Sequence, residues 1–160
     1  MTSQPPRTQW PLALLLGALA YVILASYAIA RPAIESIFLA HHSAANLPAA
    51  WVAVAIAAVI VVTGYNRACS RHSLATIFGW ATLGSGSLLA ILLGITGMEG
   101  ASAPLQSACA FLLYVWKDVY IVVLIEIFWS YANVNFPPDS ARRTYGLFCA
   151  AGSLGGMSGN

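Results

Sequence analysis

Charged residues are scarce in this chain: Asp, Glu, Lys and Arg make up 8% of the 160 residues, while hydrophobic residues make up 59%. In a soluble globular domain roughly a quarter of the residues are charged. The mean hydropathy of +0.77 therefore excludes such a domain and predicts a protein that lies in a lipid bilayer. Because the formal net charge is only +2, nothing in the composition indicates a nucleic-acid partner.

Cysteine and the motifs of enzyme chemistry are also scarce or lacking. Cys69, Cys109 and Cys149 show no metal-ligand spacing and leave one thiol over in any disulfide scheme, so we interpret them as small apolar residues. The sequence contains no GxxxxGK phosphate loop, no HExxH zinc motif and no GxSxG nucleophile elbow. We therefore expect no enzyme, no metal site and no cofactor.

Long apolar runs are what the sequence does contain. A hydrocarbon core of ~30 Å needs ~20 helical residues, so the chain has room for about five crossings. We predict an all-α fold, a polytopic transmembrane helical bundle, with a cytoplasmic tail at 1–10 and a transmembrane domain at 11–160. The predicted helices lie at about 11–35, 48–65, 73–97, 107–135 and 145–160. The first run could also be a signal peptide, but its apolar stretch is longer than the usual ~7–15 residues.

Basic residues in the connections predict the orientation of the helices. Arginines lie before the first helix, between the second and third, and between the fourth and fifth; they are Arg7, Arg67, Arg71, Arg142 and Arg143. The connections 36–47 and 98–106 contain no Lys or Arg. Since cytoplasmic connections carry the excess of basic residues, we predict a multi-pass protein with its N-terminus in the cytoplasm, in a membrane such as the bacterial inner membrane.

The last run is rich in glycine. Glycines stand four residues apart twice, at 152 and 156 and at 155 and 159, which leaves two helical faces nearly bare. Such a helix must pack closely against a neighbour. The alternative is a disordered glycine tail. If the run is a helix, it stops at Asn160 before completing a crossing, so we expect the chain to be the N-terminal piece of a larger transporter.

Two charged residues lie where the first apolar run should meet the far side of the membrane. Arg31 and Glu35 are four residues apart and share one face if the helix continues. Pro32 cannot donate a hydrogen bond to the carbonyl of Ala28 and therefore invites a kink. Either this pair holds an anionic substrate or switches partners during transport, or the two residues lie at the membrane interface, anchored by lipid headgroups and paired with each other.

Charged residues also interrupt the fourth run, where a charge at the bilayer centre costs ~2.5–3.5 kcal/mol. At ~100° per residue, Asp118 and Glu126 lie within ~80° of each other, whereas Lys117 points away from Glu126. If the fourth crossing covers about 119–138 instead, Lys117 and Asp118 lie at its outer end. We therefore predict Glu126 as the first functional residue; the alternatives are a structural pair with Arg31 and a protonated, hydrogen-bonded core residue.

Aromatic residues gather in the same run. They are Tyr114, Trp116, Tyr120, Phe128, Trp129 and Tyr131. Near helix ends such residues more often form interfacial belts than stacking sites for a ligand, and we interpret them as belts.

Two motifs resemble a known family. The run FWSYAN at 128–133, followed by DSARRTYGLF at 139–148, is similar to the end of the fourth helix and the entry to the fifth in the ATP:ADP antiporter family of nucleotide transporters. YAIAR at 27–31 and NLP at 46–48 resemble that family's first helix and loop. The resemblance implies a fold like that of the major facilitator superfamily. This chain would supply the first four helices and part of the fifth, and the substrate would move by alternating access.

The resemblance also implies roles for individual residues. Arg31 matches the arginine after the family's first helix, and Asp118 matches an acidic position in its fourth. The chain departs from the pattern at Ile34, near which the family tends to carry a lysine. The candidate membrane charges are two positive against three negative, a poor balance for an anion with several phosphates.

We therefore predict an integral membrane transporter of a small solute. Nucleotide exchange is the first candidate, and a proton-coupled solute using Glu126 is the second. The predicted substrate-binding or coupling residues are Arg31, Glu35, Lys117, Asp118 and Glu126. The expected partners are the lipid bilayer, the solute, and either a missing C-terminal half or another copy. A non-transporting scaffold or assembly protein that packs through its glycine faces is the alternative from another class, and the substrate, coupling ion and oligomeric state stay open.

Overall fold

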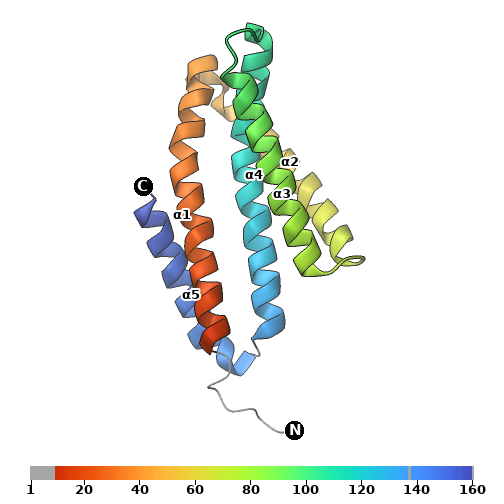
Figure 1. The fold of residues 1–160 in the computed structure, drawn as a ribbon, viewed down its shortest axis with the longest axis vertical. Helices are drawn as coiled ribbons and strands as arrows, with labels where there is room; N and C mark the ends of the chain where they lie inside the picture. The colour runs from red at the N-terminus through yellow and green to blue at the C-terminus, as the bar shows by residue number, and fades with distance from the viewer. Residues whose placement is uncertain (1–9, 137, 160) are drawn as a thin grey trace. The chain divides into compact units, whose positions relative to one another are not determined.

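The computed structural model describes residues 10–136 and 138–159, with every side chain in that range except those of 138–143. The described chain is all-α, as predicted (Figure 1). Its elements are α1 (Trp10–His41), the short 3-10 helix η2 (Ala44–Asn46), α2 (Leu47–Cys69), α3 (Leu74–Thr96), α4 (Ala103–Asn135) and α5 (Pro138–Ser158). The predicted tail, including Arg7, lies outside the described residues apart from its last position.

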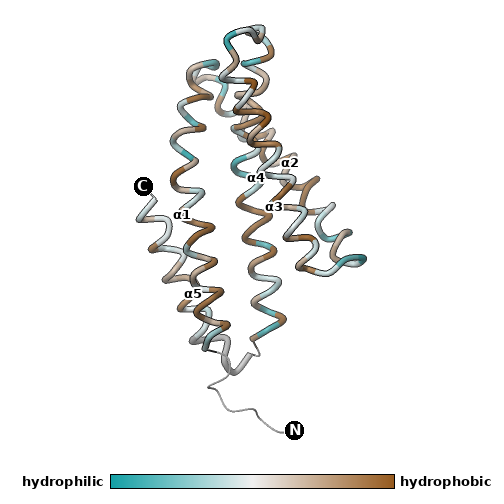
Figure 2. Tube along the Cα trace, viewed as in Figure 1, coloured by the Kyte–Doolittle hydropathy of each residue, from teal (hydrophilic) through white to brown (hydrophobic). Residues whose placement is uncertain are grey.

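Four helices, α1 to α4, are long and apolar enough to cross a membrane. Figure 2 shows hydrophobic, brown segments along α1, α3 and α4, and a hydrophilic, teal connection between α2 and α3. Large apolar side chains face outwards, and Leu15, Val59 and Leu83 are 66%, 68% and 73% exposed. Side chains of this kind are expected to contact lipid tails, so the described chain has the character of a multi-pass membrane protein.

The ends of these helices differ modestly from the predicted ones. α1 continues past the expected end at 35 to His41, and it runs through Pro32 as a helix. α4 begins at Ala103 rather than at about 107. Membrane helices tolerate proline because side chains and neighbouring groups satisfy the freed backbone. The hydroxyl of Ser36 donates to the carbonyl of Pro32 at 2.9 Å, one turn earlier in the same helix. This bond does not reach the carbonyl of Ala28, which is the group that Pro32 leaves without its usual donor.

The start of α5 corrects the prediction more strongly. The fifth helix was expected to begin at about 145, but α5 begins at Pro138. A proline is well suited to the first helical position, where its missing N–H would have no partner and its fixed φ already matches the helix. α5 is not among the candidate membrane spans, since three charged residues, Asp139, Arg142 and Arg143, occupy its beginning.

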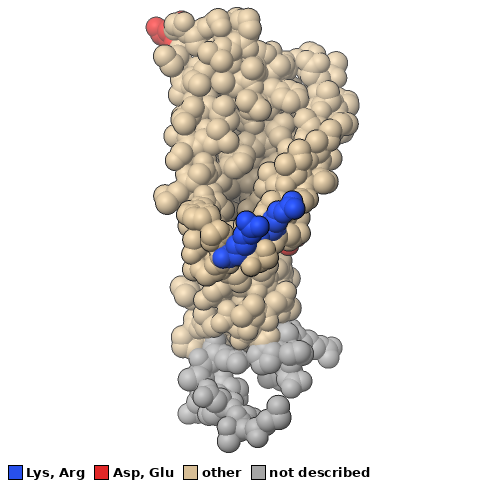
Figure 3. All heavy atoms as spheres, turned by 90° about the vertical axis from the view of Figure 1, so that its right-hand side faces the viewer, with Lys and Arg blue, Asp and Glu red and all other residues tan. Residues whose placement is uncertain are grey.

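The predicted orientation rests on basic residues that the structure describes only in part. Arg67 and Arg71, at the connection between α2 and α3, are exposed. Figure 3 shows one face on which basic atoms gather in a single place and the surrounding surface is almost free of charge. The side chains of Arg142 and Arg143 lie outside the described part. A cytoplasmic N-terminus therefore stays a prediction.

The chain divides into two compact units, residues 1–29 with 128–160, and residues 30–127. The first unit contains α5, whose Phe148 is 1% exposed. The ring of Phe148 lies 5.4 Å from that of Phe128 and 5.6 Å from that of Phe136, edge to face in both pairs. Edge-to-face pairs of buried rings stabilise a packed core beyond the apolar area they bury.

Glycines of α5 contact α1 within this first unit. A Cβ at Gly155 would collide with the backbone carbonyl of Tyr21, and a Cβ at Gly159 would lie 2.6 Å from the carbonyl oxygen of Ala25. The hydroxyls of Tyr21 and Ser158 are hydrogen-bonded at 2.8 Å. The predicted close packing is confirmed for the face of Gly155 and Gly159, and the disordered glycine tail is wrong because the helix extends to Ser158.

The second unit is built around α4. One cluster joins the end of α1 to α3 and α4 through Ile34, Leu92, Cys109 and Leu113. A second joins α1, α2 and α4 through Phe38, Ala50 and Tyr114, and a third joins α2, α3 and α4 through Tyr65, Ile77 and Ile127. All three cysteines are free thiols, and Cys109 packs as the small apolar residue that the sequence predicts.

The contact at Gly155 predicts a position-specific loss of stability. Gly155→Ala should lower the free energy of unfolding by ~1–3 kcal/mol, the usual cost of forcing an extra methyl group into a packed contact. Gly156→Ala is the matched control, because no described atom lies within 4 Å of a Cβ at that position. Thermal unfolding of both variants in one detergent measures the difference, and equal stability would contradict the packing of α5 on α1.

Candidate functional site

Lys117 is a buried charge near the middle of an apolar helix. Its side chain is 3% exposed, and α4 runs from Ala103 to Asn135 rather than over 119–138. It lies well inside the helix, and the alternative in which the fourth crossing covers only about 119–138 stays a prediction. Since placing a lone ammonium group in an apolar interior costs several kcal/mol, its surroundings must supply partners.

Two carboxylates and an aromatic ring surround the Lys117 ammonium group. Lys117 Nζ donates to Asp118 Oδ1 and Oδ2, both at 3.0 Å, and lies 3.6 Å from Glu35 Oε1. The ring centroid of Tyr114 lies 4.2 Å from the same nitrogen, within the range of a cation–π interaction. No local pattern in the sequence indicates the contact between Lys117 and Glu35, because it joins two different helices, α1 and α4.

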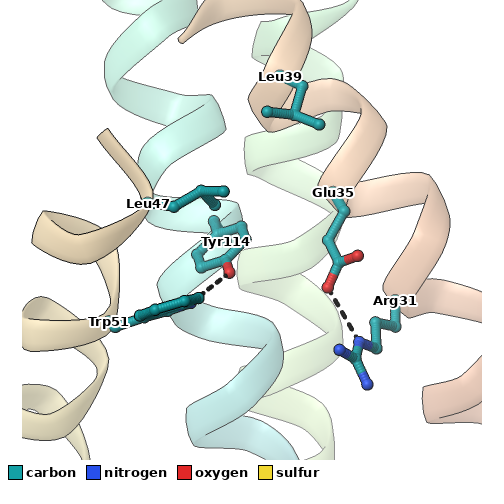
Figure 4. A pocket seen from close by; sticks show the side chains of 6 residues that line it. All are labelled: Arg31, Glu35, Leu39, Leu47, Trp51 and Tyr114. Atoms are coloured by element: carbon teal, nitrogen blue, oxygen red, sulfur yellow. Dashed lines mark hydrogen bonds and ion pairs between the residues drawn. The ribbon is translucent and has the colours of Figure 1, made fainter. Parts of the chain in front are cut away.

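Glu35 links this buried group to Arg31. Arg31 Nε donates to Glu35 Oε1 at 2.9 Å (Figure 4), so the prediction that these residues share one helical face is confirmed. The same oxygen faces Lys117. We call Arg31, Glu35, Lys117 and Asp118 the charge network. It contains two positive and two negative side chains, and its formal charges therefore sum to zero.

Glu126 lies apart from the charge network. It is exposed and makes no hydrogen bond or ion pair with the part of the chain that the structure describes. Arg31 pairs with Glu35 instead, so the alternatives of a structural pair with Arg31 and of a hydrogen-bonded core residue are wrong. The predicted angular separation explains this placement, because nine residues along a helix put Glu126 opposite Lys117. A functional role for Glu126 stays a prediction.

A cavity of about 230 Å³ lies beside the charge network. Its lining residues come from three helices, as Figure 4 shows: Arg31, Glu35 and Leu39 from α1, Leu47 and Trp51 from α2, and Tyr114 from α4. One wall therefore carries paired opposite charges, while aromatic rings and leucines form the remainder. Such a combination of apolar walls and few polar groups is typical of sites for small molecules.

Tyr114 connects the cavity to the buried cation. Its residue is 4% exposed, and its hydroxyl accepts a hydrogen bond from Trp51 Nε1 at 3.0 Å. The ring of Phe38 lies 4.6 Å away, so the phenol is held on several sides. The interpretation of the aromatics as an interfacial belt is wrong for Tyr114, which is a buried wall residue.

Sequence reasoning missed three further lining residues, Leu39, Leu47 and Trp51. No pattern in the sequence separates these from the other apolar residues of their helices. A tryptophan near the start of a predicted crossing is ordinarily an interfacial anchor. The one available signal was the polar entry to the second helix, which places Leu47 and Trp51 close to the same membrane level as the end of the first.

The arrangement can bind charges and exchange ion-pair partners. Glu35 Oε1 already faces two cations, Arg31 and Lys117. A ligand or proton that binds this carboxylate would therefore weaken both ion pairs. Among the residues that the structure describes, no group of three His, Cys, Asp or Glu side chains could hold a metal ion. The chemistry that these side chains offer is recognition and ion-pair exchange.

Comparisons of the chain with models of known families, with curated proteins and with solved structures find no match. The resemblance to the ATP:ADP antiporter family therefore stays a prediction from the motifs at 27–31, 46–48, 128–133 and 139–148. The charge network and its cavity are the features that bear on function.

The charge network predicts a non-additive mutant cycle. Asp118→Leu should destabilise the protein by ~1–3 kcal/mol, because it removes the closest partner of a buried ammonium group. Adding Lys117→Met should restore most of that loss, since a buried pair replaced by apolar residues of similar size is often neutral. Arg31 and Glu35 remain paired in the double variant.

Thermal or denaturant unfolding in detergent measures both steps. Glu126→Gln is the control and should change stability by less than ~0.5 kcal/mol, as expected for an exposed residue with no partner in the described part of the chain. Additive losses in the double variant would show that Asp118 and Lys117 do not interact.

Proposed function

We propose that this protein is a membrane transporter that moves a small solute by alternating access, and that the charge network and its cavity form the solute-binding or coupling site. Lys117 carries the proposal: a lysine buried in a candidate membrane span and paired with carboxylates of α1 and α4. Ionisable residues inside membrane segments are costly, and they commonly mark substrate or ion pathways.

Stability does not account for the charge network. Replacing a buried ion pair by well-packed apolar residues often leaves a protein as stable or more stable. The network also joins two helices distant in sequence, α1 and α4, through the single oxygen that Arg31 and Lys117 share. A solute or proton bound at Glu35 would change this connection, which supports a role in coupling binding to helix movement.

The identity of the solute is a narrower question. The resemblance favours a nucleotide, for which Arg31 would contact phosphate. Against this, the four charges at the site sum to zero, and the 230 Å³ cavity is smaller than the ~300–1,000 Å³ of most small-molecule sites. These observations favour a smaller solute with little net charge over an anion with several phosphates.

The scaffold alternative loses part of its basis. It relied on glycine faces left open for another protein, but Gly155 and Gly159 contact Tyr21 and Ala25 of the same chain. Gly156 alone, among the glycines at 152, 155, 156 and 159, has no atom within 4 Å of an added Cβ. No feature of the described residues favours a scaffold over a transporter.

Uptake by cells that express the protein tests the proposal. The labelled solutes should include adenine nucleotides, amino acids and sugars, and at least one should accumulate above the level of cells without the protein. Lys117→Met should then reduce that uptake by ~10-fold or more, because the carboxylates lose the cation with which they exchange. Comparable amounts of each variant in the membrane, measured by blotting, are required.

Glu126→Gln is the matched control for this experiment and also tests the prediction from the sequence. Unchanged uptake by Glu126→Gln, with uptake lost in Lys117→Met, supports the charge network as the functional site. Accumulation of none of the solutes would overturn the transporter. Loss of uptake in Glu126→Gln alone would move the coupling role from Lys117 to Glu126.

A further inference from the structure

The polar wall of the cavity presents two opposite charges side by side. Arg31 and Glu35 both line the cavity, and their side chains meet at 2.9 Å. Arg31 is 58% exposed in its side chain and Glu35 is 36% exposed, so both can be reached from the cavity. A guanidinium group recognises a carboxylate, and a carboxylate recognises an ammonium group. The wall is therefore complementary to a molecule that carries both groups close together, as on a single carbon atom.

Charge neutrality restricts the ligand further. The four side chains of the charge network sum to zero, and they belong to helices that are candidate membrane spans. A ligand with net charge would leave an unbalanced charge between helices that are candidate membrane spans, which is unfavourable. A zwitterion adds none, since each of its charges pairs with one already present.

The other walls favour an apolar side group on the ligand. The rest of the lining consists of Leu39, Leu47, Trp51 and Tyr114. Trp51 Nε1 donates a hydrogen bond to the Tyr114 hydroxyl, so these two polar groups already satisfy each other. The volume of about 230 Å³ equals roughly eight water molecules at ~30 Å³ each. This space suits a compact head group with a side chain of moderate size.

We infer that the cavity takes a zwitterionic solute of the α-amino-acid type, whose carboxylate pairs with Arg31 and whose ammonium group pairs with Glu35. Its apolar side group lies among Leu39, Leu47 and Trp51. This inference rests on the proposed function, which it narrows to a substrate class. No covalent step is involved, and binding exchanges one ion pair within the protein for two between protein and ligand.

Matched ligands test the zwitterion requirement directly on the purified full chain in detergent. L-Phenylalanine is compared with phenethylamine and 3-phenylpropanoate, which share its ring but carry one charge each. L-Leucine is compared in the same way with 3-methylbutylamine and 4-methylpentanoate. At least one of the two amino acids should bind in an equilibrium assay with labelled ligand, and its singly charged analogues should compete at least ~10-fold more weakly.

Variants of the polar wall should change which ligand is preferred, an effect that a purely structural role would not produce. Arg31→Gln should weaken amino-acid binding and favour the amine, because the network then has one negative charge in excess. Glu35→Gln should favour the carboxylate analogue for the opposite reason. Arg67→Gln is the control, an exposed arginine in the last turn of α2 that does not line the cavity, and it should bind like the unmodified protein.

The outcomes separate this inference from the proposed function. If neither amino acid binds, or if the singly charged analogues bind equally well, the zwitterion site is wrong. If adenine nucleotides accumulate in the uptake experiment and amino acids do not, the transporter stands and the substrate class is overturned. If an amino acid binds with the expected preference but no solute accumulates, the site stands and transport is overturned.

Discussion

Lys117 belongs to the apolar helix α4, and its ammonium group is buried between helices. The surrounding side chains must offset the free-energy cost of that burial. Asp118 is the next residue in α4, but its own carboxylate is half-buried. The pair of charges therefore needs further partners. Glu35 of α1 and the ring of Tyr114 provide them. This requirement fixes which level of α1 faces which level of α4 in the unit 30–127, and the cavity lies where the two helices meet α2.

Local patterns predicted most of the helices because hydropathy and length decide membrane segments almost independently of tertiary contacts. α2 and α3 begin and end within a few residues of the predicted bounds. The start of α5 was missed because Pro138 is compatible with both a connector and a first helical turn. The pairing of Arg31 with Glu35 was also predictable from the local sequence. Residues four positions apart lie on the same face of a helix, where their side chains can meet.

The remainder of the site could not be predicted because it depends on contacts between helices. Lys117 and Glu35 meet only after α1 packs on α4, and nothing in either local sequence specifies that register. The angular argument correctly separated Lys117 from Glu126, but it could not say which side of α4 faces the protein. Lys117 lies on the packed side and Glu126 on the exposed side. Glu126 was chosen as the first functional residue from its expected depth in the membrane alone. Which side of α4 packs against the rest of the protein was not known from the sequence.

An uneven distribution of burial within the charge network connects stability with function. Lys117 is almost fully enclosed, whereas Glu35 and Arg31 become progressively more exposed toward the cavity. In the proposed site a ligand would meet first the charges that cost least to rearrange, and the shared oxygen of Glu35 would carry the change to the buried cation. If only the Arg31–Glu35 pair were present, a ligand could exchange partners without affecting α4. Because Lys117 faces the same carboxylate, binding at the α1 wall would also alter an ion-pair contact between α1 and α4. That contact adds to the apolar clusters around Ile34 and Phe38, which also join the two helices.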